Sequence, residues 1–190
     1  MIFARFISTV LHPFIVAPVT FFLLLQNSDL PTLNRIIIFS VASIAAVFLP
    51  LIHVYLMKRR GHTSGLDIPE REKRISPFVV SIINYSLALI VIWLLRGPKS
   101  LIILMWAYVF NTIVATLITK YWKISIHGMA LGGPIAALGQ AISLQFYWFI
   151  PSVFFMLYSR VKLNAHTPMQ VLVGFFLGFF LTVTHYKLLA

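Results

Sequence analysis

The sequence predicts an all-α protein, a multi-pass transmembrane helical bundle of six to seven spans. Apolar residues make up 60% of the 190 residues, whereas soluble domains contain about 45–50%. Charged residues make up only 10%, against about 25% in an ordinary soluble domain. Uncharged apolar runs of about 18 residues recur along the chain, which is typical of transmembrane helices. The alternating pattern of a membrane barrel is absent.

The first apolar run, from Phe6 to Leu25, predicts the first span, with His12-Pro13 and Pro18 inside it. It lacks a small-residue cleavage site, so we expect a retained span rather than a signal peptide. A polar turn over 26–34 leads to a second span at about 36–57.

The segment 58–76 is the one long hydrophilic stretch and is expected to form a polar loop. Its basic start, 58–60, is expected to set orientation or contact anionic lipids. The acidic residues of the chain number four, and three of them fall in this loop: Asp67, Glu70 and Glu72. Two further spans are expected at 77–95 and 101–119, on either side of a tight turn at 96–100.

The stretch from Gly128 to Tyr158 carries no formal charge. One tilted helix could absorb about 25 of these residues. We expect two short spans instead, split near 140–145, and six spans in total if one segment only re-enters the membrane. The last span is expected at 168–186, so that residues 1–190 form a single integral membrane domain.

Counting the spans places the N-terminus and the loops at 58–76, 120–127 and 159–166 on one membrane face. That face holds 11 of the 15 lysines and arginines, and such an excess favours the cytoplasmic side. The imbalance falls to 7 against 4 if four cations that are candidates for phosphate binding are left out. The face of the membrane therefore stays open.

Several classes of site are not expected. The basic residues are too dispersed in apolar sequence for a nucleic-acid partner. The chain has no cysteine, and therefore no disulfide or thiolate chemistry. His127 and His166 have no third ligand near them in the sequence, so we expect neither a metal nor another cofactor.

The shared face collects guanidinium groups and two histidines, and this combination indicates a phosphate ester site. Arginine presents a planar fork to phosphate oxygens. Histidine can attack phosphorus or donate a proton to a leaving oxygen. Clustered cations supply the charge stabilisation that phosphoryl transfer needs. The candidates are Arg71, Arg74, Lys123, Ser125, His127, Gly128, Arg160 and His166.

The residues after His166 predict the start of a helix. Thr167 can cap it, and Pro168 suits its first turn. His166 would then lie just before a helix N-terminus, where backbone N–H groups favour anions. Gln170, one turn further on, could orient the histidine ring. Gly174 and Gly178 form a small-xxx-small stripe that favours close helix packing.

The stretch SRVKLNAHTPMQ, 159–170, resembles the third signature of the type 2 phosphatidic acid phosphatase (PAP2) superfamily, S-R-x5-H-x3-D. Its serine, arginine and histidine match in spacing, whereas Gln170 stands where the family has aspartate. KISIHG, 123–128, resembles the second signature, P-S-G-H, through Ser125 and His127.

The first signature, K-x6-R-P, is echoed by Arg74 and Pro77, with Arg71 as a substitute for the lysine and Asp67 at the lysine's own position. The resemblance extends from Arg71 to Gly178. It implies a PAP2-like helical bundle.

The resemblance also implies a role for each candidate. His166 would be the nucleophile that forms a phosphohistidine, and His127 would protonate the leaving alcohol. The phosphate would be held by the remaining candidates: Arg160, Arg74 and Arg71, with Ser125 and the Gly128 backbone nearby. Lys123 fits a phosphate contact and an orientation charge equally well.

Gln170 puts one role in question, because a neutral amide can orient a histidine but cannot stabilise its cation. In serine proteases the comparable loss of a carboxylate costs about 10⁴-fold. We therefore hypothesise that Asp67, Glu70 or Glu72 approaches the histidines or orders the arginines. An internal i,i+4 pair of Glu70 with Arg74 is the simpler alternative.

The function expected is metal-independent dephosphorylation of a lipid phosphate or diphosphate through a phosphohistidine. Phosphatidic acid, phosphatidylglycerol phosphate, polyprenyl (di)phosphate and lipid A phosphate all remain possible substrates. A non-catalytic lipid-phosphate binder or transporter is the alternative, and a purely structural membrane protein is a third reading. Membrane lipids are the other expected partners, and the oligomeric state stays open.

Four further polar residues lie within the expected spans. His12 and His53 are intramembrane ionisable residues, but a structural role is favoured for both. Asn111 and Gln140 are expected to make interhelical hydrogen bonds.

Overall fold

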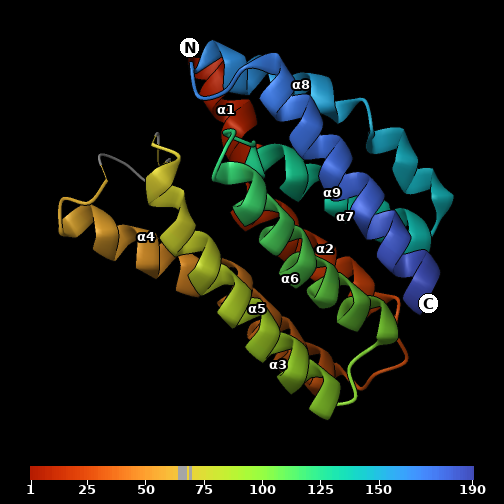
Figure 1. Ribbon diagram of the computed structural model, residues 1–190. Helices are drawn as coiled ribbons and strands as arrows, with labels where there is room; N and C mark the ends of the chain where they lie inside the picture. Colours follow the sequence, from red (N-terminus) through yellow and green to blue (C-terminus); the bar gives the residue numbers. More distant parts are fainter. Residues whose placement is uncertain (64–67, 69) are drawn as a thin grey trace.

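The computed structural model describes residues 1–63, 68 and 70–190, and in these residues it contains helices and no strand (Figure 1). The α-helices are α1 (Ile2–Val10), α2 (Pro13–Gln26), α3 (Thr32–Ser43), α4 (Leu49–Arg59), α5 (Ile75–Leu94), α6 (Lys99–Thr119), α7 (Ile126–Ala141), α8 (Ser152–Lys162) and α9 (Pro168–Leu189). A π-helix, η1 (Ile44–Phe48), joins α3 to α4, and two 3₁₀ helices, η2 (Glu72–Arg74) and η3 (Leu144–Phe149), precede α5 and α8. The predicted all-α fold is confirmed.

Five helical stretches among the described residues are long and apolar enough to cross a membrane: Ile2–Gln26, Thr32–Arg59, Glu72–Leu94, Lys99–Thr119 and Pro168–Leu189. The expected split near 140–145 is confirmed, because α7 ends at Ala141 and η3 begins at Leu144. However, α7 has 16 residues and α8 has 11, too few for a full span of about 20. The bundle therefore has five long helices and a shorter pair.

The first span is not one continuous helix, as the hydropathy suggested, but two. The ring nitrogen Nδ1 of His12 accepts a hydrogen bond of 3.1 Å from the backbone N–H of Phe14, and Pro13 occupies the first turn of α2. A side-chain cap followed by proline is a strong helix start. The chain therefore breaks at His12 and places its ring at the junction of α1 and α2.

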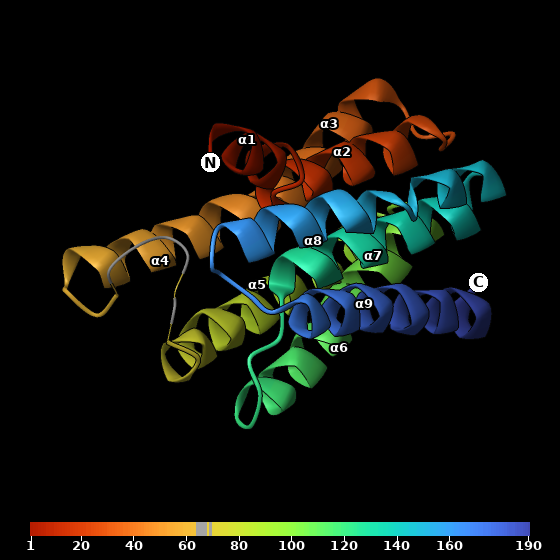
Figure 2. The same cartoon turned by 90° about the horizontal axis from the view of Figure 1, so that it is seen from above.

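The helices are arranged around a central pair (Figures 1 and 2). Helices α2 and α6 lie between α3 and α5 on one side and α7 and α9 on the other. The side chain of Asn111 on α6 donates to Thr182 on α9 over 3.1 Å, and that of Gln140 donates to Tyr147. Both interhelical hydrogen bonds are as predicted. Figure 1 also shows α4 diverging from α5 toward the loop between them.

Helices α7 and α9 run in parallel and pack backbone to backbone. A Cβ atom on Gly174 would lie 2.4 Å from the carbonyl oxygen of Ser125, and one on Gly178 would lie 2.5 Å from that of Met129. Gly128 and Gly132 on α7 approach α9 as closely. The predicted stripe of small residues is confirmed, and it brings the N-termini of α7 and α9 side by side.

Candidate functional site

A cavity of about 260 Å³ is lined by residues of the α1–α2 junction, of α4, of the first part of α5 and near the starts of α7 and α9. The N-terminus lies at this end of the bundle (Figure 1). The arginine and histidine side chains of the cavity come from all three sequence motifs and from the N-terminal helices: Arg74, His127, Arg160, His166 and His12. The first four of these are predicted site residues, drawn from chain segments up to 92 residues apart. The fold thus brings together the two histidines and two of the arginines.

The turn between α8 and α9 returns His166 to the cavity. Asn164 adopts a positive φ of 54°, which asparagine tolerates better than most residues. The backbone N–H groups of Ala165 and His166 both donate to the carbonyl oxygen of Arg160, over 3.0 and 3.3 Å. Arginine and histidine of the third motif are therefore held together by one short turn.

Gln170 orients His166 through the helix cap. Its Oε1 accepts from the backbone N–H of Thr167 over 3.2 Å, and the Thr167 hydroxyl in turn caps the Gln170 N–H. The same Oε1 lies 3.0 Å from Nδ1 of His166. Because this amide oxygen can only accept, Nδ1 must carry the hydrogen. The lone pair of the neutral ring is then on Nε2.

The pKa of His166 is lowered to about 3. Burial is the main cause, since the residue is only 8% exposed, and low-dielectric surroundings disfavour the imidazolium. The positive charges of Arg74, Lys123 and Arg160 lower it further, against the opposing hydrogen bond to Gln170. His166 is therefore neutral at physiological pH and has an available nucleophilic nitrogen.

The second motif forms the start of α7. Ser125 is fully buried, and its hydroxyl accepts the backbone N–H of Gly128 over 3.3 Å as a helix cap. Its own N–H donates to the carbonyl oxygen of Gln170. His127, in the first turn, lines the cavity. The N-termini of α7 and α9 thus both lie at the site, and their dipoles favour an anion there.

The two cavity arginines are held by neutral oxygen atoms. Arg160 is 2% exposed, and its Nη1 donates to the hydroxyl of Ser8 over 2.8 Å. Arg74 donates through Nε to the carbonyl oxygen of Ile68 over 2.7 Å and through Nη1 to that of Ile124 over 3.3 Å. These hydrogen bonds fix the direction of both guanidinium groups at the cavity.

Not every predicted site residue lines the cavity. Among the described residues, the lining includes neither Arg71 nor Lys123, and neither Ser125 nor Gly128. Arg71 points to the carbonyl oxygen of Tyr121 over 2.6 Å and to Glu72 over 2.7 Å. Lys123 is half-buried and close enough to His166 to act on its pKa.

Of the three acidic residues in the loop at 58–76, one behaves as the hypothesis allowed. Glu72 orders Arg71, one of the two outcomes that the hypothesis allowed. Glu70 pairs with Lys73 over 3.2 Å rather than with Arg74, so the alternative of an i,i+4 pair between Glu70 and Arg74 is wrong. Asp67 lies outside the described residues.

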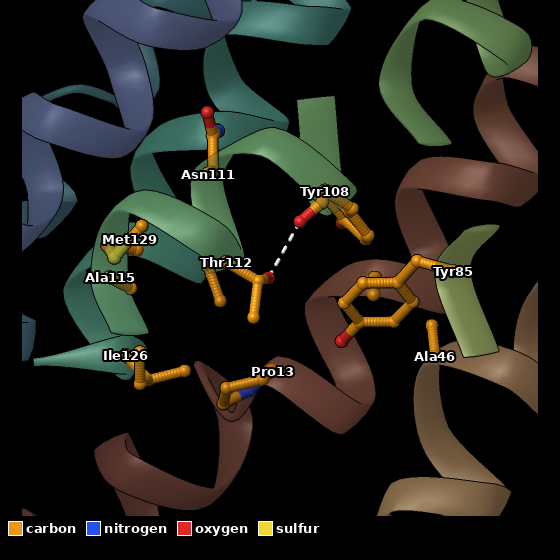
Figure 3. A pocket seen from close by; sticks show the side chains of 12 residues that line it. Pro13, Ala46, Tyr85, Tyr108, Asn111, Thr112, Ala115, Ile126 and Met129 are labelled. Carbon is orange, nitrogen blue, oxygen red and sulfur yellow. Dashed lines mark hydrogen bonds between the residues drawn. The ribbon is translucent and has the colours of Figure 1, made fainter. Parts of the chain in front are cut away.

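The rest of the cavity is lined mainly by apolar side chains and leads inward. Side chains of α4 and α5, among them Pro50, Val54 and Phe78, form its walls. A second pocket of about 90 Å³ shares Pro13, Ala46 and other lining residues with it and is surrounded by α2, η1, α5, α6 and α7 (Figure 3). The dashed line in Figure 3 is the hydrogen bond of the Thr112 hydroxyl to the Tyr108 carbonyl. The site thus combines a cationic end with an apolar interior.

Sequence reasoning missed two residues of the site: His12, which lines the cavity, and Ser8, which contacts Arg160. His12 was assigned a structural role, although its position as an ionisable residue within an apolar run was a usable signal. Ser8 carried no signal at all, because its partner Arg160 is 152 residues away.

In the described residues no group of three or more His, Cys, Asp or Glu side chains is placed to hold a metal ion. Neither the curated proteins nor the solved structures include a match to the chain. The family model of the PAP2 superfamily matches residues 99–190, which contain His127, Arg160, His166 and Gln170. This C-terminal segment of the chain is therefore similar to the PAP2 superfamily.

Proposed function

We propose that the protein removes a phosphoryl group from a membrane lipid phosphate or diphosphate through a phosphohistidine on His166. The match of residues 99–190 to the PAP2 superfamily supports a phosphatase-type hydrolase in general. One observation carries the more specific proposal: neutral His166, His127, Arg160 and Arg74 line a single cavity whose remaining wall is mainly apolar.

The first step uses the lone pair on Nε2 of His166. It attacks phosphorus, the bond from phosphorus to the lipid oxygen breaks, and His127 as an imidazolium donates its proton to that leaving oxygen. Arg160 and Arg74 stabilise the charge on the phosphoryl oxygens. In the second step, water attacks the phosphohistidine while neutral His127 takes a proton from it. The bond to nitrogen breaks, and the lone pair returns to Nε2.

The substrate is amphiphilic in this proposal. The phosphate group occupies the cationic end of the cavity, and the hydrocarbon chain extends along α4 and α5 toward the inner pocket. Apolar side chains predominate in the lining of the cavity and of the inner pocket. Which lipid phosphate is used depends on the chain and headgroup that these walls accept.

A panel of lipid phosphates tests this function. It contains phosphatidic acid, phosphatidylglycerol phosphate, a polyprenyl diphosphate and a lipid A phosphate, and phosphate release is measured for the purified chain in detergent. His166→Ala is expected to abolish release, while His62→Ala, an exposed histidine outside the cavity, keeps it. Equal release by the native chain and His166→Ala would reject the proposal.

A non-catalytic lipid-phosphate binder or transporter is the second candidate, and Gln170 favours it, because a neutral amide at 3.0 Å stabilises the cation on His166 less than a carboxylate would. Vanadate binding without phosphate release from any lipid in the panel would identify this second function.

A further inference from the structure

The N-terminal helix α1 lies against the part of the chain that contains the third motif. Its Ala4 carbonyl oxygen accepts the hydroxyl of Ser159 over 2.8 Å, and its Ser8 hydroxyl accepts Nη1 of Arg160 over the same distance. All four residues are buried. Both hydrogen bonds come from consecutive residues of the motif, although α1 lies outside the segment that matches the family.

The junction of α1 and α2 makes a second contact, with the second motif. The ring of His12 meets that of His127 edge to face, with centroids 4.8 Å apart and planes at 89°. Since Nδ1 of His12 accepts the N–H of Phe14, the neutral ring carries its hydrogen on Nε2. His12 is therefore fixed by the helix cap, and it in turn packs against the ring of His127.

We propose that the segment from Ala4 to His12 is part of the phosphate site, with Ser8 and His12 as positioning residues. Ser8 sets the direction of the Arg160 guanidinium, and His12 sets the ring plane of His127. This rests on the proposed function, because both residues act through groups that would hold or protonate a phosphate ester. The consequence is that the family segment 99–190 alone lacks part of its own site.

Ser8 is tested by the affinity for vanadate, a phosphate analogue, in the purified full-length chain. A hydrogen bond to a charged group contributes about 1.5–3 kcal/mol, so Ser8→Ala is expected to weaken binding about tenfold to a hundredfold. Ser8→Thr keeps the hydroxyl and should restore most of the affinity. Thr9→Ala removes the neighbouring hydroxyl, which bonds only within α1 to the Arg5 carbonyl, and should leave affinity unchanged.

His12 has two functions that substitution can separate. Asparagine is a good cap residue, so His12→Asn keeps the acceptor for Phe14 but removes the imidazole beside His127. It should lower kcat about tenfold or more while KM and the melting temperature stay near native values. His12→Ala loses the cap as well and should also melt earlier. A native kcat for His12→Asn would overturn the role of His12.

The outcomes separate this inference from the proposed function. If the native chain binds vanadate but releases no phosphate from any lipid, phosphatase activity is rejected, and Ser8→Ala still tests the positioning of Arg160. Equal vanadate affinity of Ser8→Ala and the native chain, with both folded, overturns the role of Ser8. Failure of the native chain to bind vanadate overturns both proposals.

Discussion

The amide of Gln170 decides both the orientation of His166 and the charge that this histidine can bear. Its oxygen fixes Nδ1 as a donor through a 3.0 Å hydrogen bond, which suits a nucleophile at Nε2. It adds no negative charge, whereas an aspartate partner would stabilise the imidazolium that accompanies phosphoryl transfer. Orientation is therefore retained in this chain, and charge stabilisation is reduced.

Gln170→Glu should restore that charge without disturbing the helix cap, since glutamate also completes a capping box. A carboxylate at this distance is expected to raise the pKa of His166 by about one to three units and to increase kcat about tenfold or more. The measurement is phosphate release against pH. Gln170→Met, which has a similar length and no amide, should be slower than the native chain. A Glu variant with native kcat and an unchanged pH profile would contradict the assignment.

The low pKa of His166 also predicts acid sensitivity of the fold. Between pH 6.5 and about 3 the ring binds fewer protons in the folded than in the unfolded state, so the free energy of unfolding falls as pH drops through this window. His166→Gln should remove part of that fall. The melting temperature in detergent from pH 7 to pH 4 measures it, with His62→Gln as an exposed control. Equal slopes for His166→Gln and the native chain would argue against a depressed pKa.

Sequence reasoning found those site residues whose relation is local or is encoded in a motif. Arg160, His166 and Gln170 are linked by one turn and one helix cap, which spacing and cap chemistry predict. Ser8 and His12 could not be found in this way, because their contacts join distant segments and follow only from how the helices pack. The direction of Arg71 is set by its contacts with adjacent Glu72 and with the carbonyl of Tyr121, and the motif spacing does not encode these partners.

At the level of helices, hydropathy predicted where apolar segments occur but not where each helix begins and ends. An average over about 20 residues does not resolve the cap at His12 or the π-helix before Pro50. A proline in this position cannot donate to the carbonyl four residues earlier. The close contact of α7 with α9 was indicated by the spacing of glycines only on the α9 side.

The α7–α9 contact predicts unequal effects of two neighbouring substitutions. A Cβ on Gly132 would lie 2.2 Å from the carbonyl oxygen of Phe175, whereas one on Gly133 would lie 3.3 Å from the side-chain oxygen of Thr182. Backbone atoms cannot move aside as a side chain can. Gly132→Ala should therefore lower the free energy of unfolding by about 1–3 kcal/mol and the melting temperature by several degrees. Gly133→Ala should cost less. Equal losses would contradict the packing described.

The whole molecule joins a cationic end to an apolar interior, and this predicts how substrate size matters. Ala46 on η1 lines both the cavity and the inner pocket, so Ala46→Phe should obstruct the passage between them. Release from long-chain lipid phosphates should fall about tenfold or more, while release from a short-chain analogue changes little. Ile44→Phe adds a ring on the exposed side of the same helix and is the matched control. Equal losses on both substrates would point to general damage instead.

The arrangement of the whole chain also predicts its topology. The N-terminus lies at the end of the bundle that carries the cavity, and the C-terminus lies at the opposite end (Figure 1). There the hydroxyl of Tyr186 on α9 donates to the carbonyl of Ser100, near the start of α6, over 2.6 Å. Reporters fused to the two termini should therefore report opposite membrane faces.

The excess of lysine and arginine further predicts a cytoplasmic N-terminus. A reporter that is fluorescent only in the cytoplasm should then be active at the N-terminus, and one that is enzymatically active only outside should be active at the C-terminus. The opposite result at both termini would be consistent with the fold but would contradict the prediction from charge. The cations of the cavity would then be explained by phosphate binding rather than by membrane orientation. Two termini on the same face would contradict the fold itself.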